Sequence, residues 1–406
     1  MFEGLGSTSN DQEVVITGAA AVVAGMVGSH ALWQALKRDE LLANHHLPEP
    51  HRAALNGLTV GEQQVLSVQQ QLGLAVGEMA WSQALLPSSR HPLRGECQPS
   101  PQDPWRLRAG VVSASALGYA TALLDELAQS EGRPSATSLS RWRGNGLGAA
   151  VALRFGLRGE QLNLNSASST GAQALAVAAR CITRGEQELM VVVGAEPALP
   201  TLLMEANQRT GAIASSGSSR PLTAHRSGMV PREAAGCLVL ESRQRAEARG
   251  AVVLGRVVTT ASGCEAHHLV APLPGQALSD HLLARLLQGA GGLDASAIDW
   301  ICLHATGTRR FDQEELQFVR RAFPNVPWIS AMKRSLGHGL GAAGVVEAAL
   351  MLEGLQRGSV PPWPDDIDPC LDWPSHPPRP APAPRLALQL SSGMGGVVVM
   401  NLFGHA

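Results

Sequence analysis

Residues 161–196 constrain the fold most, because they predict a strand, a tight turn, a buried helix and a second strand in immediate succession. Gln161–Asn165 alternates apolar and polar side chains, which is typical of a half-buried strand. Ala172–Thr183 is almost continuously apolar and rich in alanine, as a buried helix is, and Met190–Val193 is an entirely apolar strand. Such a succession is typical of an α/β fold with layered sheets.

Ser168 lies on a run of small residues, Ser166–Gly171, between this strand and this helix. The N-terminus of a helix carries a partial positive charge and free N–H donors, and both favour a developing anion. One interpretation is therefore a nucleophile at Ser168. The other is a small-residue turn that precedes a core helix, and the stretch alone leaves both open.

The rest of the chain alternates predicted strands and helices in two runs of similar outline, which indicates an internal duplication. Residues 197–236 are expected to be irregular, with the segment 219–236 too polar for the core, and Lys333–Gly341 is expected to be a loop. Strands are predicted at Glu13–Gly18, Leu107–Ser113, Cys237–Ser242, Val252–Ser262, Ile298–Leu303, Trp328–Ala331, Leu386–Leu390 and Val397–Phe403, and helices at Ser29–Lys37 (Ser29 as N-cap), Gln63–Leu86, Gly118–Ser130, Ser138–Phe155, Leu278–Leu287, Asp312–Arg321 and Ala342–Leu355.

Composition narrows the class of protein. A length of 406 residues allows roughly two domain-sized units, and a net charge of -2 argues against a dedicated nucleic-acid or membrane-surface binder. No apolar run has the length of a membrane span and the N-terminus shows no signal sequence, so a cytoplasmic protein is expected. The six cysteines are scattered without CxxC spacing, which predicts neither a metal site nor a disulfide framework.

Two further loops carry residues suited to catalysis. His304 follows the C-terminal end of a buried strand in CLHATGT (302–308), where catalytic groups of α/β sheets gather. Lys333 and His338 share the glycine-rich loop MKRSLGHGLGAAG (332–344) before a buried helix. Each has an ordinary structural explanation by itself. Together with Ser168, they are the groups that acyl transfer requires.

Short motifs occur in a fixed order along nearly the whole chain: EVVITG near the start, RFGLRG (154–159), SASSTGAQA (166–174), GAE (194–196), SRPLTAHRSG (219–228), HATGT (304–308), KRSLGHGLGAAGVVEA (333–348) and GMGG (393–396). In this order they resemble the β-ketoacyl-ACP synthases (ketosynthases) of the thiolase superfamily. The resemblance implies a thiolase-like fold in which two pseudo-duplicated α/β halves, residues 1–245 and 246–406, form a five-layer αβαβα arrangement. The first half carries the nucleophile position, and the second carries both histidines and the lysine.

The resemblance also implies a role for each residue of the site. Ser168 stands where the family has its nucleophilic cysteine. His304 and His338 stand at the histidines that bind the malonyl thioester carbonyl and assist decarboxylation. Lys333 stands at the lysine that orients the site electrostatically.

Further positions support this set. Asp312 and Glu315 match acidic residues that support the network, and Thr306 and Thr308 match threonines that contact phosphopantetheine. The backbone N–H groups of Met394 and of the nucleophile position are expected to form the oxyanion hole. No metal or cofactor of its own is implied, because the phosphopantetheine arrives on an acyl carrier protein.

The implied partners are the acidic acyl carrier protein and a second ketosynthase subunit, in a homodimer or a heterodimer. Arg309 and Arg310, and separately Arg180 and Arg184, are candidate contacts to the carrier protein, although solvation of the surface explains each of them equally. A thiolase acting on coenzyme A is disfavoured, because thiolases need a second cysteine as acid and base.

Three positions depart from the family. Ser168 replaces a thiol by a far less acidic hydroxyl, as a natural variant or an engineered substitution; Met394 replaces a phenylalanine; and Arg232 replaces a glycine. Two functions remain open. One is a ketosynthase-like acyltransferase of fatty acid or polyketide-type biosynthesis that acts on acyl or malonyl carrier-protein thioesters. The other is a non-condensing subunit, like a chain-length factor, that pairs with an active ketosynthase.

Overall fold

Two arrays of five strands each form the centre of the molecule. The computed structural model describes residues 12–406 apart from 40, 44–45, 88–102, 131, 215, 218, 324, 326–327, 375 and 378–379. The first array holds β1 (Val14–Val23), β3 (Ala109–Ala114), β4 (Gln161–Leu164), β5 (Leu189–Glu196) and β6 (Ala234–Ser242), with β2 (Met26–Val27) paired on β1. The second holds β7 (Gly255–Cys264), β8 (Trp300–Cys302), β9 (Trp328–Ser330), β10 (Leu386–Gly393) and β11 (Val397–Gly404).

The two arrays repeat one topology. The strand order is β4-β3-β5-β6-β1 in the first array and β9-β8-β10-β11-β7 in the second. In each array the outer pairs are parallel, and the last two pairs are antiparallel. The arrays join edge to edge where Val14–Ile16 pairs with Gly255–Val257. This repetition confirms the internal duplication, whereas the exact division at residue 245 stays a prediction.

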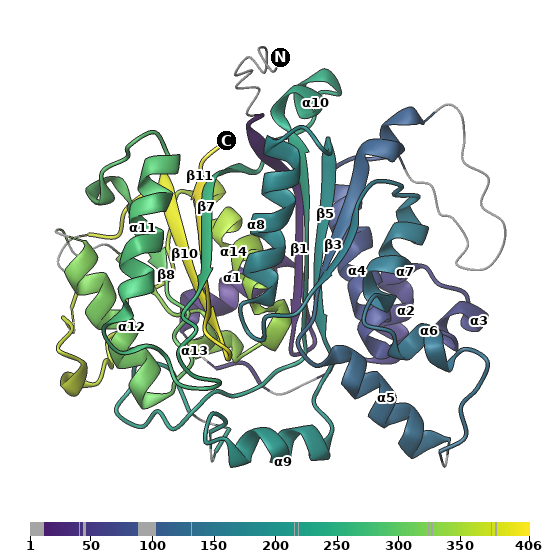
Figure 1. Ribbon diagram of the computed structural model, residues 1–406, viewed down its shortest axis with the longest axis horizontal. Helices are drawn as coiled ribbons and strands as arrows, with labels where there is room; N and C mark the ends of the chain where they lie inside the picture. Colours follow the sequence, from purple (N-terminus) through teal and green to yellow (C-terminus); the bar gives the residue numbers. More distant parts are fainter. Residues whose placement is uncertain are drawn as a thin grey trace, which may run out of the picture.

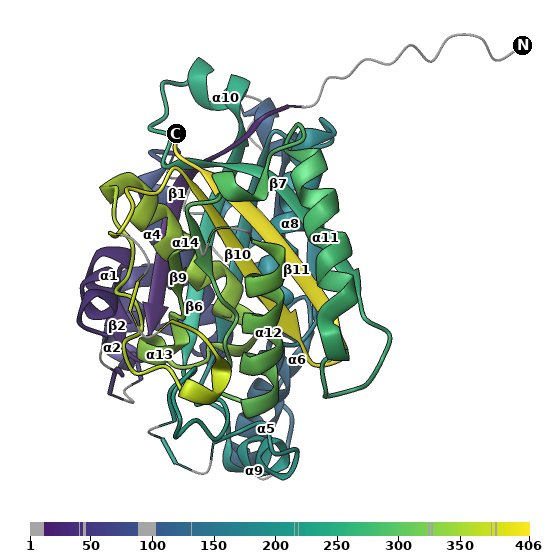
Figure 2. The same cartoon turned by 90° about the vertical axis from the view of Figure 1, so that its left-hand side faces the viewer.

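Helices complete the five layers (Figures 1 and 2). The central layer consists of α8 (Thr170–Thr183), which contacts β3, β5, β7 and β11, and α14 (Ala343–Arg357), which contacts β1, β6 and β10. The outer face of the first array is covered by α4 (Val68–Gln83) and α7 (Gly146–Phe155). The second array is covered by α11 (Ala277–Gly289), with α12 (Arg309–Ala322) beside it. The predicted αβαβα arrangement is therefore confirmed.

Shorter elements surround these layers. The remaining α-helices are α1 (Ser29–Arg38), α2 (Glu49–Asn56), α3 (Val60–Gln63), α5 (Gly118–Gln129), α6 (Ser138–Trp142), α9 (Thr201–Arg209), α10 (Arg243–Ala248) and α13 (Lys333–Leu336). Short 3-10 turns lie at Pro104–Arg108, Pro274–Gln276, Ala295–Ala297, Leu340–Ala342 and Pro369–Leu371. No helix within the described ranges is both long and apolar enough to cross a bilayer.

The two central helices touch through their backbones. A Cβ atom added at Gly344 would lie 2.3 Å from the amide nitrogen of Ala172, and one added at Gly171 would lie 2.8 Å from the amide nitrogen of Val345. Protein interiors are close-packed, so no side chain fits between helices at this separation. The run of small residues around Ser168 therefore serves the contact between the helices as well as the turn.

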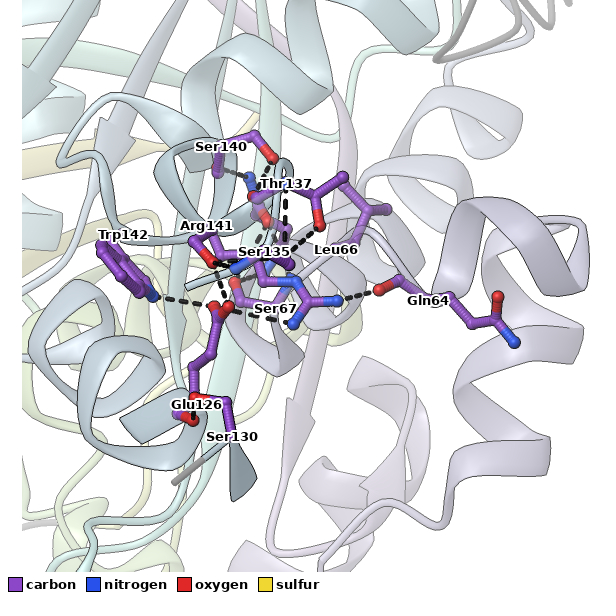
Figure 3. A network of polar contacts seen from close by, with 12 residues as sticks. Gln64, Leu66, Ser67, Glu126, Ser130, Ser135, Thr137, Ser140, Arg141 and Trp142 are labelled. Atoms are coloured by element: carbon purple, nitrogen blue, oxygen red, sulfur yellow. Dashed lines mark hydrogen bonds and ion pairs between the residues drawn. The ribbon is translucent and has the colours of Figure 1, made fainter. Parts of the chain in front are cut away.

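A partly buried polar network holds the outer helices of the first half together (Figure 3). The carboxylate of Glu126 on α5 accepts hydrogen bonds from the indole Nε1 of Trp142 (2.8 Å) and from the hydroxyl of Ser138, both on α6. Arg141 on the same helix lies 3.6 Å from this carboxylate and donates to the carbonyl oxygen of Gln64, just after α3. Because these polar groups are paired with one another, the helices keep a fixed arrangement.

Capping explains two differences from the predicted helices. The stretch Gln63–Leu86 is divided between α3 and α4, because the Ser67 hydroxyl accepts from the Gln70 N–H while the Gln70 side chain accepts from the Ser67 N–H. This reciprocal capping box starts a new helix. Ser29 is the first residue of α1 rather than its N-cap, a position that Gly28 occupies without a side-chain hydrogen bond.

The segment 197–236 differs more strongly from its prediction. It contains α9, and its last residues, Ala234–Gly236, belong to the buried strand β6. Arg226 is buried as well, because its guanidinium pairs with Asp368 at 2.6 Å and lies 3.6 Å from Asp312. Polar residues thus enter the core here through ion pairs with distant parts of the chain. The loop predicted at Lys333–Gly341 likewise begins with α13.

The contact between the central helices gives a first prediction. Gly344→Ala is expected to lower the free energy of unfolding by about 1–3 kcal/mol, because the added methyl group would push α8 and α14 apart. Urea denaturation followed by circular dichroism measures this change. The matched control is Gly144→Ala, where an added Cβ meets nothing within 4 Å. Equal stability of the two variants would contradict the close contact.

Candidate active site

The structure places most of the predicted site on the wall of one cavity of about 230 Å³. Lys333, Asp312 and Glu315 do not line this cavity but lie buried behind it. The sequence-predicted residues on the wall are Ser168, His304, His338, Thr306, Thr308 and Met394. They come from both halves of the chain, so the site exists only where the two halves meet.

Ser168 sits on a turn that is hydrogen-bonded within itself. Thr170 Oγ1 accepts from the Ser166 N–H (2.9 Å), and the Ser169 hydroxyl donates to the Ser166 carbonyl (2.8 Å). Ala167 adopts a positive φ of 52° just before Ser168. Ser168 is buried, and its hydroxyl makes no hydrogen bond to any other described residue. It therefore faces the cavity at the N-terminus of α8, on the same wall as His304 and His338.

The tautomer of His338 follows from its backbone neighbour. Its Nδ1 accepts a hydrogen bond from the Leu340 N–H at 3.0 Å, so the proton of the neutral ring sits on Nε2. Nε2 has no partner in the described part of the chain. The backbone of His338 is fixed by hydrogen bonds with Val230 (2.8 Å) and Arg232 (3.0 Å). The Nε2–H group is therefore a fixed donor that can serve a ligand.

His304 is oriented in a similar way at the end of β8. Its backbone N–H donates to Glu315 Oε1 at 2.7 Å, and its Nδ1 lies 3.4 Å from the Nζ of Lys333. The lysine ammonium can only donate, so Nδ1 accepts and Nε2 again carries the proton. The ring lies edge-on to His338, with 5.7 Å between the centroids. Two imidazole donors thus share one cavity.

Both histidines are held neutral. Burial is the main cause that lowers the pKa of His304 and of His338 well below the ordinary value, and the charge of Lys333 lowers both further. Near neutral pH both rings are therefore uncharged, and each can donate a hydrogen bond from Nε2.

Lys333 has a partner that the sequence analysis did not identify. Its Nζ lies 2.5 Å from Oε1 of Glu347 on α14, and both side chains are almost fully buried. An isolated buried charge is very costly, so the ammonium depends on this carboxylate. An acidic residue within the apolar first half of this helix was the sequence signal that could have revealed Glu347.

Asp312 and Glu315 hold the turn that carries the threonines. Glu315 also accepts from the Ala305 N–H at 2.8 Å, while Asp312 accepts from the Gly307 N–H at 3.0 Å. Burial raises the pKa of Glu315 to about 8 and that of Asp312 to about 6. The turn brings the hydroxyls of Thr306 and Thr308 to 3.0 Å from each other at the cavity wall.

The two residues expected to supply the oxyanion donors, Ser168 and Met394, both line the cavity. The turns that carry them touch, because a Cβ at Gly393 would lie 2.2 Å from the Ser166 carbonyl oxygen. Met394 itself packs on an apolar cluster that includes Met229 and Leu340. An anion bound in the cavity can therefore reach two backbone donors.

The candidate carrier-protein contacts fall in two places. Arg310 lines the cavity beside Thr308, and Arg309 donates to the Ala224 carbonyl (3.3 Å). Arg180 and Arg184 instead line a different cavity at the far end of α8, roughly 18–24 Å along the helix axis from Ser168. The structure thus brings Arg310 to the cavity wall but not Arg180 or Arg184, and a contact of either pair with the carrier protein stays a prediction.

Other residues of the cavity were not anticipated, namely Met229, Glu265, Val270 and Phe311. Phe311 packs edge-on to the His304 ring at 5.2 Å between centroids. No group of three or more metal-ligating side chains occurs in the part of the chain that the structure describes.

Comparison with known proteins agrees with this scaffold, in which a thiolase-like α/β duplication encloses a histidine-bearing cavity. Residues 51–246 match the family model of the β-ketoacyl synthase N-terminal domain, and residues 254–365 match that of the C-terminal domain. Together these matches cover well over half of the chain. The chain belongs to the β-ketoacyl synthase family.

Individual relatives share less than a third of the aligned residues with this chain. The 3-oxoacyl-(acyl-carrier-protein) synthase 2 of Mycobacterium leprae is 31% identical over 280 residues, which is 66% of each chain. Nodulation protein E of Rhizobium meliloti is 32% identical over 62% of this chain and 64% of its own length. The alignments thus span slightly less than two thirds of these relatives.

Solved structures show the same fold over almost the entire chain. A β-ketoacyl synthase from Burkholderia phymatum superimposes with a TM-score of 0.81 at 24% identity, covering 97% of this chain and all of that one. The ishigamide ketosynthase/chain length factor gives 0.80 at 23% identity. A type II polyketide synthase acyl-carrier protein in complex with its ketosynthase gives 0.79 at 22% identity. The last two cover 98% of this chain and 100% of the matched chain.

The neutral His338 predicts a pH dependence of stability. The unfolded chain takes up a proton at this histidine near pH 6.5 and the folded chain does not, so the free energy of unfolding falls as pH drops below that value. His338→Asn, whose side-chain oxygen can still accept from Leu340, removes this contribution. Urea denaturation at pH 7 and pH 5 should show the wild type losing up to about 1.4 kcal/mol more per pH unit below 6.5 than the variant.

Asp312 and Glu315 act with the opposite sign, because their raised pKa values make the folded state bind more protons as pH falls. Comparing the variant with the wild type cancels their contribution. His281, exposed on α11, provides the matched control, and His281→Asn should follow the wild-type pH dependence. Parallel pH profiles of wild type and His338→Asn would contradict a neutral, buried His338.

Proposed function

We propose that this chain is a ketosynthase-like acyltransferase that acts on acyl or malonyl thioesters of an acyl carrier protein, in fatty acid or polyketide-type biosynthesis, with Ser168 at the acyl-accepting position. The observation that carries the proposal is the pair of buried, neutral histidines whose Nε2–H groups are available to a ligand. Two such donors suit the carbonyl oxygen of a thioester, on which charge develops during decarboxylation.

Decarboxylation needs no nucleophile from the protein. The bond between the malonyl carboxylate and its neighbouring carbon breaks, CO₂ leaves, and the electron pair forms an enolate whose charge falls on the thioester oxygen. Hydrogen bonds from His304 and His338 stabilise that oxygen, and they do so strongly because the site is buried. The Lys333 ammonium helps to keep both rings neutral, so they remain donors throughout.

Acyl transfer to Ser168 has a different requirement, because the hydroxyl proton must pass to a base. The Nε2 atoms of His304 and His338 already carry protons, and the Ser168 hydroxyl makes no hydrogen bond to another described residue. We therefore expect ester formation at Ser168, and hydrolysis of that ester, to be slower than decarboxylation of a malonyl thioester.

The partner in this proposal is an acyl carrier protein, whose phosphopantetheine arm enters the cavity beside Thr306 and Thr308. Arg310 at the same wall offers a positive charge to an acidic partner. Names of relatives support this assignment, since one is an acyl-carrier-protein-dependent synthase and one solved structure is a ketosynthase bound to its carrier protein. The chain needs no cofactor of its own in this mechanism.

Incubation with malonyl-carrier protein tests the proposal. The wild type is expected to convert it to acetyl-carrier protein, as the enolate carbon takes a proton from water after CO₂ leaves, and intact-protein mass spectrometry detects the loss of CO₂. His338→Ala should slow this step by about 10²–10³-fold, because one donor to the enolate oxygen is lost. Ser168→Ala is the matched control and should decarboxylate at the wild-type rate. If the wild type neither decarboxylates malonyl-carrier protein nor takes an acyl mass at Ser168 from acyl-carrier protein, the proposal is wrong.

Condensation should depend on the missing thiol. A cysteine at a helix N-terminus is partly thiolate near neutral pH and needs no base. Ser168→Cys is therefore expected to form a β-ketoacyl-carrier protein from acyl- and malonyl-carrier proteins, and the wild type to form far less. The product mass distinguishes them. A Ser168→Cys protein that becomes acylated but never condenses would show that the rest of the site is not that of a condensing enzyme.

A second candidate function is favoured by the hydroxyl of Ser168 where the family has its nucleophilic thiol, namely a non-condensing subunit like a chain-length factor. Strand β4 lies at the outer edge of the first array, with Gln161 and Asn163 exposed and no strand on its free side in the described part of the chain. Such an edge can pair with a strand of another chain. We propose that a second ketosynthase subunit, identical or homologous, pairs there.

Co-expression with a cysteine-bearing ketosynthase separates the two functions. The acyltransferase proposal predicts a homodimer that decarboxylates malonyl-carrier protein by itself. The alternative predicts a stable heterodimer on size-exclusion chromatography, with turnover only in the mixed complex. In both cases Asn163→Pro, which removes a backbone donor from the β4 edge, should weaken the dimer.

A further inference from the structure

Two fully buried amides face the central helices from neighbouring strands. Gln389 on β10 and Asn401 on β11 are direct cross-strand partners, and neither side chain is exposed. Asn401 Nδ2 donates to Gln389 Oε1 (3.0 Å) and to the carbonyl of Ala172 on α8 (3.1 Å). Gln389 Nε2 donates to the carbonyl of Gly344 on α14 (2.7 Å). Four elements therefore meet in one hydrogen-bonded cluster.

Filling the core with Gln389 and Asn401 costs free energy that apolar side chains would not cost. Burying an amide costs free energy unless all of its polar atoms are hydrogen-bonded, and apolar side chains of similar volume carry no such cost. Asn401 Oδ1 has no partner in the part of the chain that the structure describes, so the cluster is not fully satisfied. A buried polar group that is only partly satisfied calls for an explanation other than packing.

The position of Gln389 and Asn401 in the fold suggests why these amides are buried. Gly344 lies three residues before Glu347 on α14, and Glu347 pairs with Lys333 at 2.5 Å. Ala172 lies in the first turn of α8, directly after the turn that carries Ser168. The two amides thus contact the central helices at the turns from which both parts of the site project.

We propose that Gln389 and Asn401 are positioning residues, which fix the first turns of α8 and α14 relative to each other and so set Ser168 relative to the Lys333–His304 pair. The inference deepens the proposed function and rests on it for its catalytic consequence. Its geometric consequence is the position of the residue 168 side chain in the electrostatic field of the site. This position can be tested without any turnover.

Of the two amides, that of Gln389 also acts on the buried charge of Glu347. Burial raises the pKa of Glu347, and Lys333 and then the Gln389 amide oppose that rise. The other titratable groups whose pKa values respond to Lys333 are Cys302, His304, Asp312, Glu315 and His338. Loss of the amides is therefore expected to weaken the ionised Lys333–Glu347 pair and with it the positive field near residue 168.

The experiment uses Ser168→Cys as a reporter background, because a thiol reveals the local field without any catalytic turnover. The pH dependence of alkylation of this introduced thiol by iodoacetamide, followed by peptide mass spectrometry, gives its pKa. Adding Gln389→Met and Asn401→Leu removes both amides together at similar volume. We expect the thiol pKa to rise by about 0.5–1 unit, which reduces the thiolate fraction at pH 7 by about 3–10-fold.

Two further variants separate positioning from simple packing. The exchanged pair, Gln389→Asn with Asn401→Gln, restores two amides at the same positions and should return the thiol pKa most of the way to that of the reporter. Ser391→Ala, on the same strand, removes a buried hydroxyl that has no partner among the described residues, and should leave the thiol pKa unchanged. In the Ser168 protein, the amide-free pair should lower kcat for malonyl decarboxylation with little change in KM.

A folded amide-free protein whose introduced thiol has the same pKa as that of the reporter would overturn the inference, even if its melting temperature fell. If the double variant does not fold, Asn401→Leu alone keeps the Gln389 contact with α14 and is judged by the same pKa criterion. Absence of decarboxylation in the wild type, together with a shifted pKa in the amide-free reporter, would reject the proposed function and leave the positioning role standing.

Discussion

The structure depends on the direct backbone contact between α8 and α14. Without side chains at Gly171 and Gly344, the two helices approach as closely as their backbones allow, and a strand array packs on each side of them. Both helices start at the cavity, one after Ser168 and the other after the loop of His338. The separation of the two parts of the site is thus set by a close-packed contact, which can hardly be compressed or stretched.

Around that contact, the site relies on charges and amides that the core encloses. Lys333 needs Glu347 as a counterion, and Glu315 accepts backbone N–H groups from the turn that begins at His304. These partners fix side chains that solvent would otherwise leave mobile. They also determine protonation, since burial and the lysine charge keep the histidines neutral and therefore able to donate from Nε2. The same few buried pairs therefore fix both the positions of these side chains and their protonation.

The sequence predicted those parts of the molecule whose signal is local. The helices α8 and α14 and strand β5 are recognisable because their apolar runs are long, and the site residues because each ends an element. Helix α9 was missed because none of its residues is buried, so it carries no apolar stripe. Arg226 was placed outside the core because its partners, Asp312 and Asp368, are far away in sequence. Gln389 and Asn401 were passed over for the same reason, since only the folded chain shows what their amides bind.

A condensing site normally has to stabilise an enolate and also accept an acyl group. The oxygen atom of Ser168, in place of a sulfur, affects only the second of these requirements. Stabilising an enolate needs fixed hydrogen-bond donors, and in the proposed function the Nε2–H groups of His304 and His338 provide them whatever stands at residue 168. Accepting an acyl group needs an ionised or base-activated nucleophile, which a thiol at a helix N-terminus supplies by its own acidity and a hydroxyl does not. A histidine could serve as that base only if its Nε2 lost the proton, and it would then no longer donate to the enolate oxygen. Under the proposed function, the site would therefore favour the decarboxylating half of the chemistry, and the serine would be the cause.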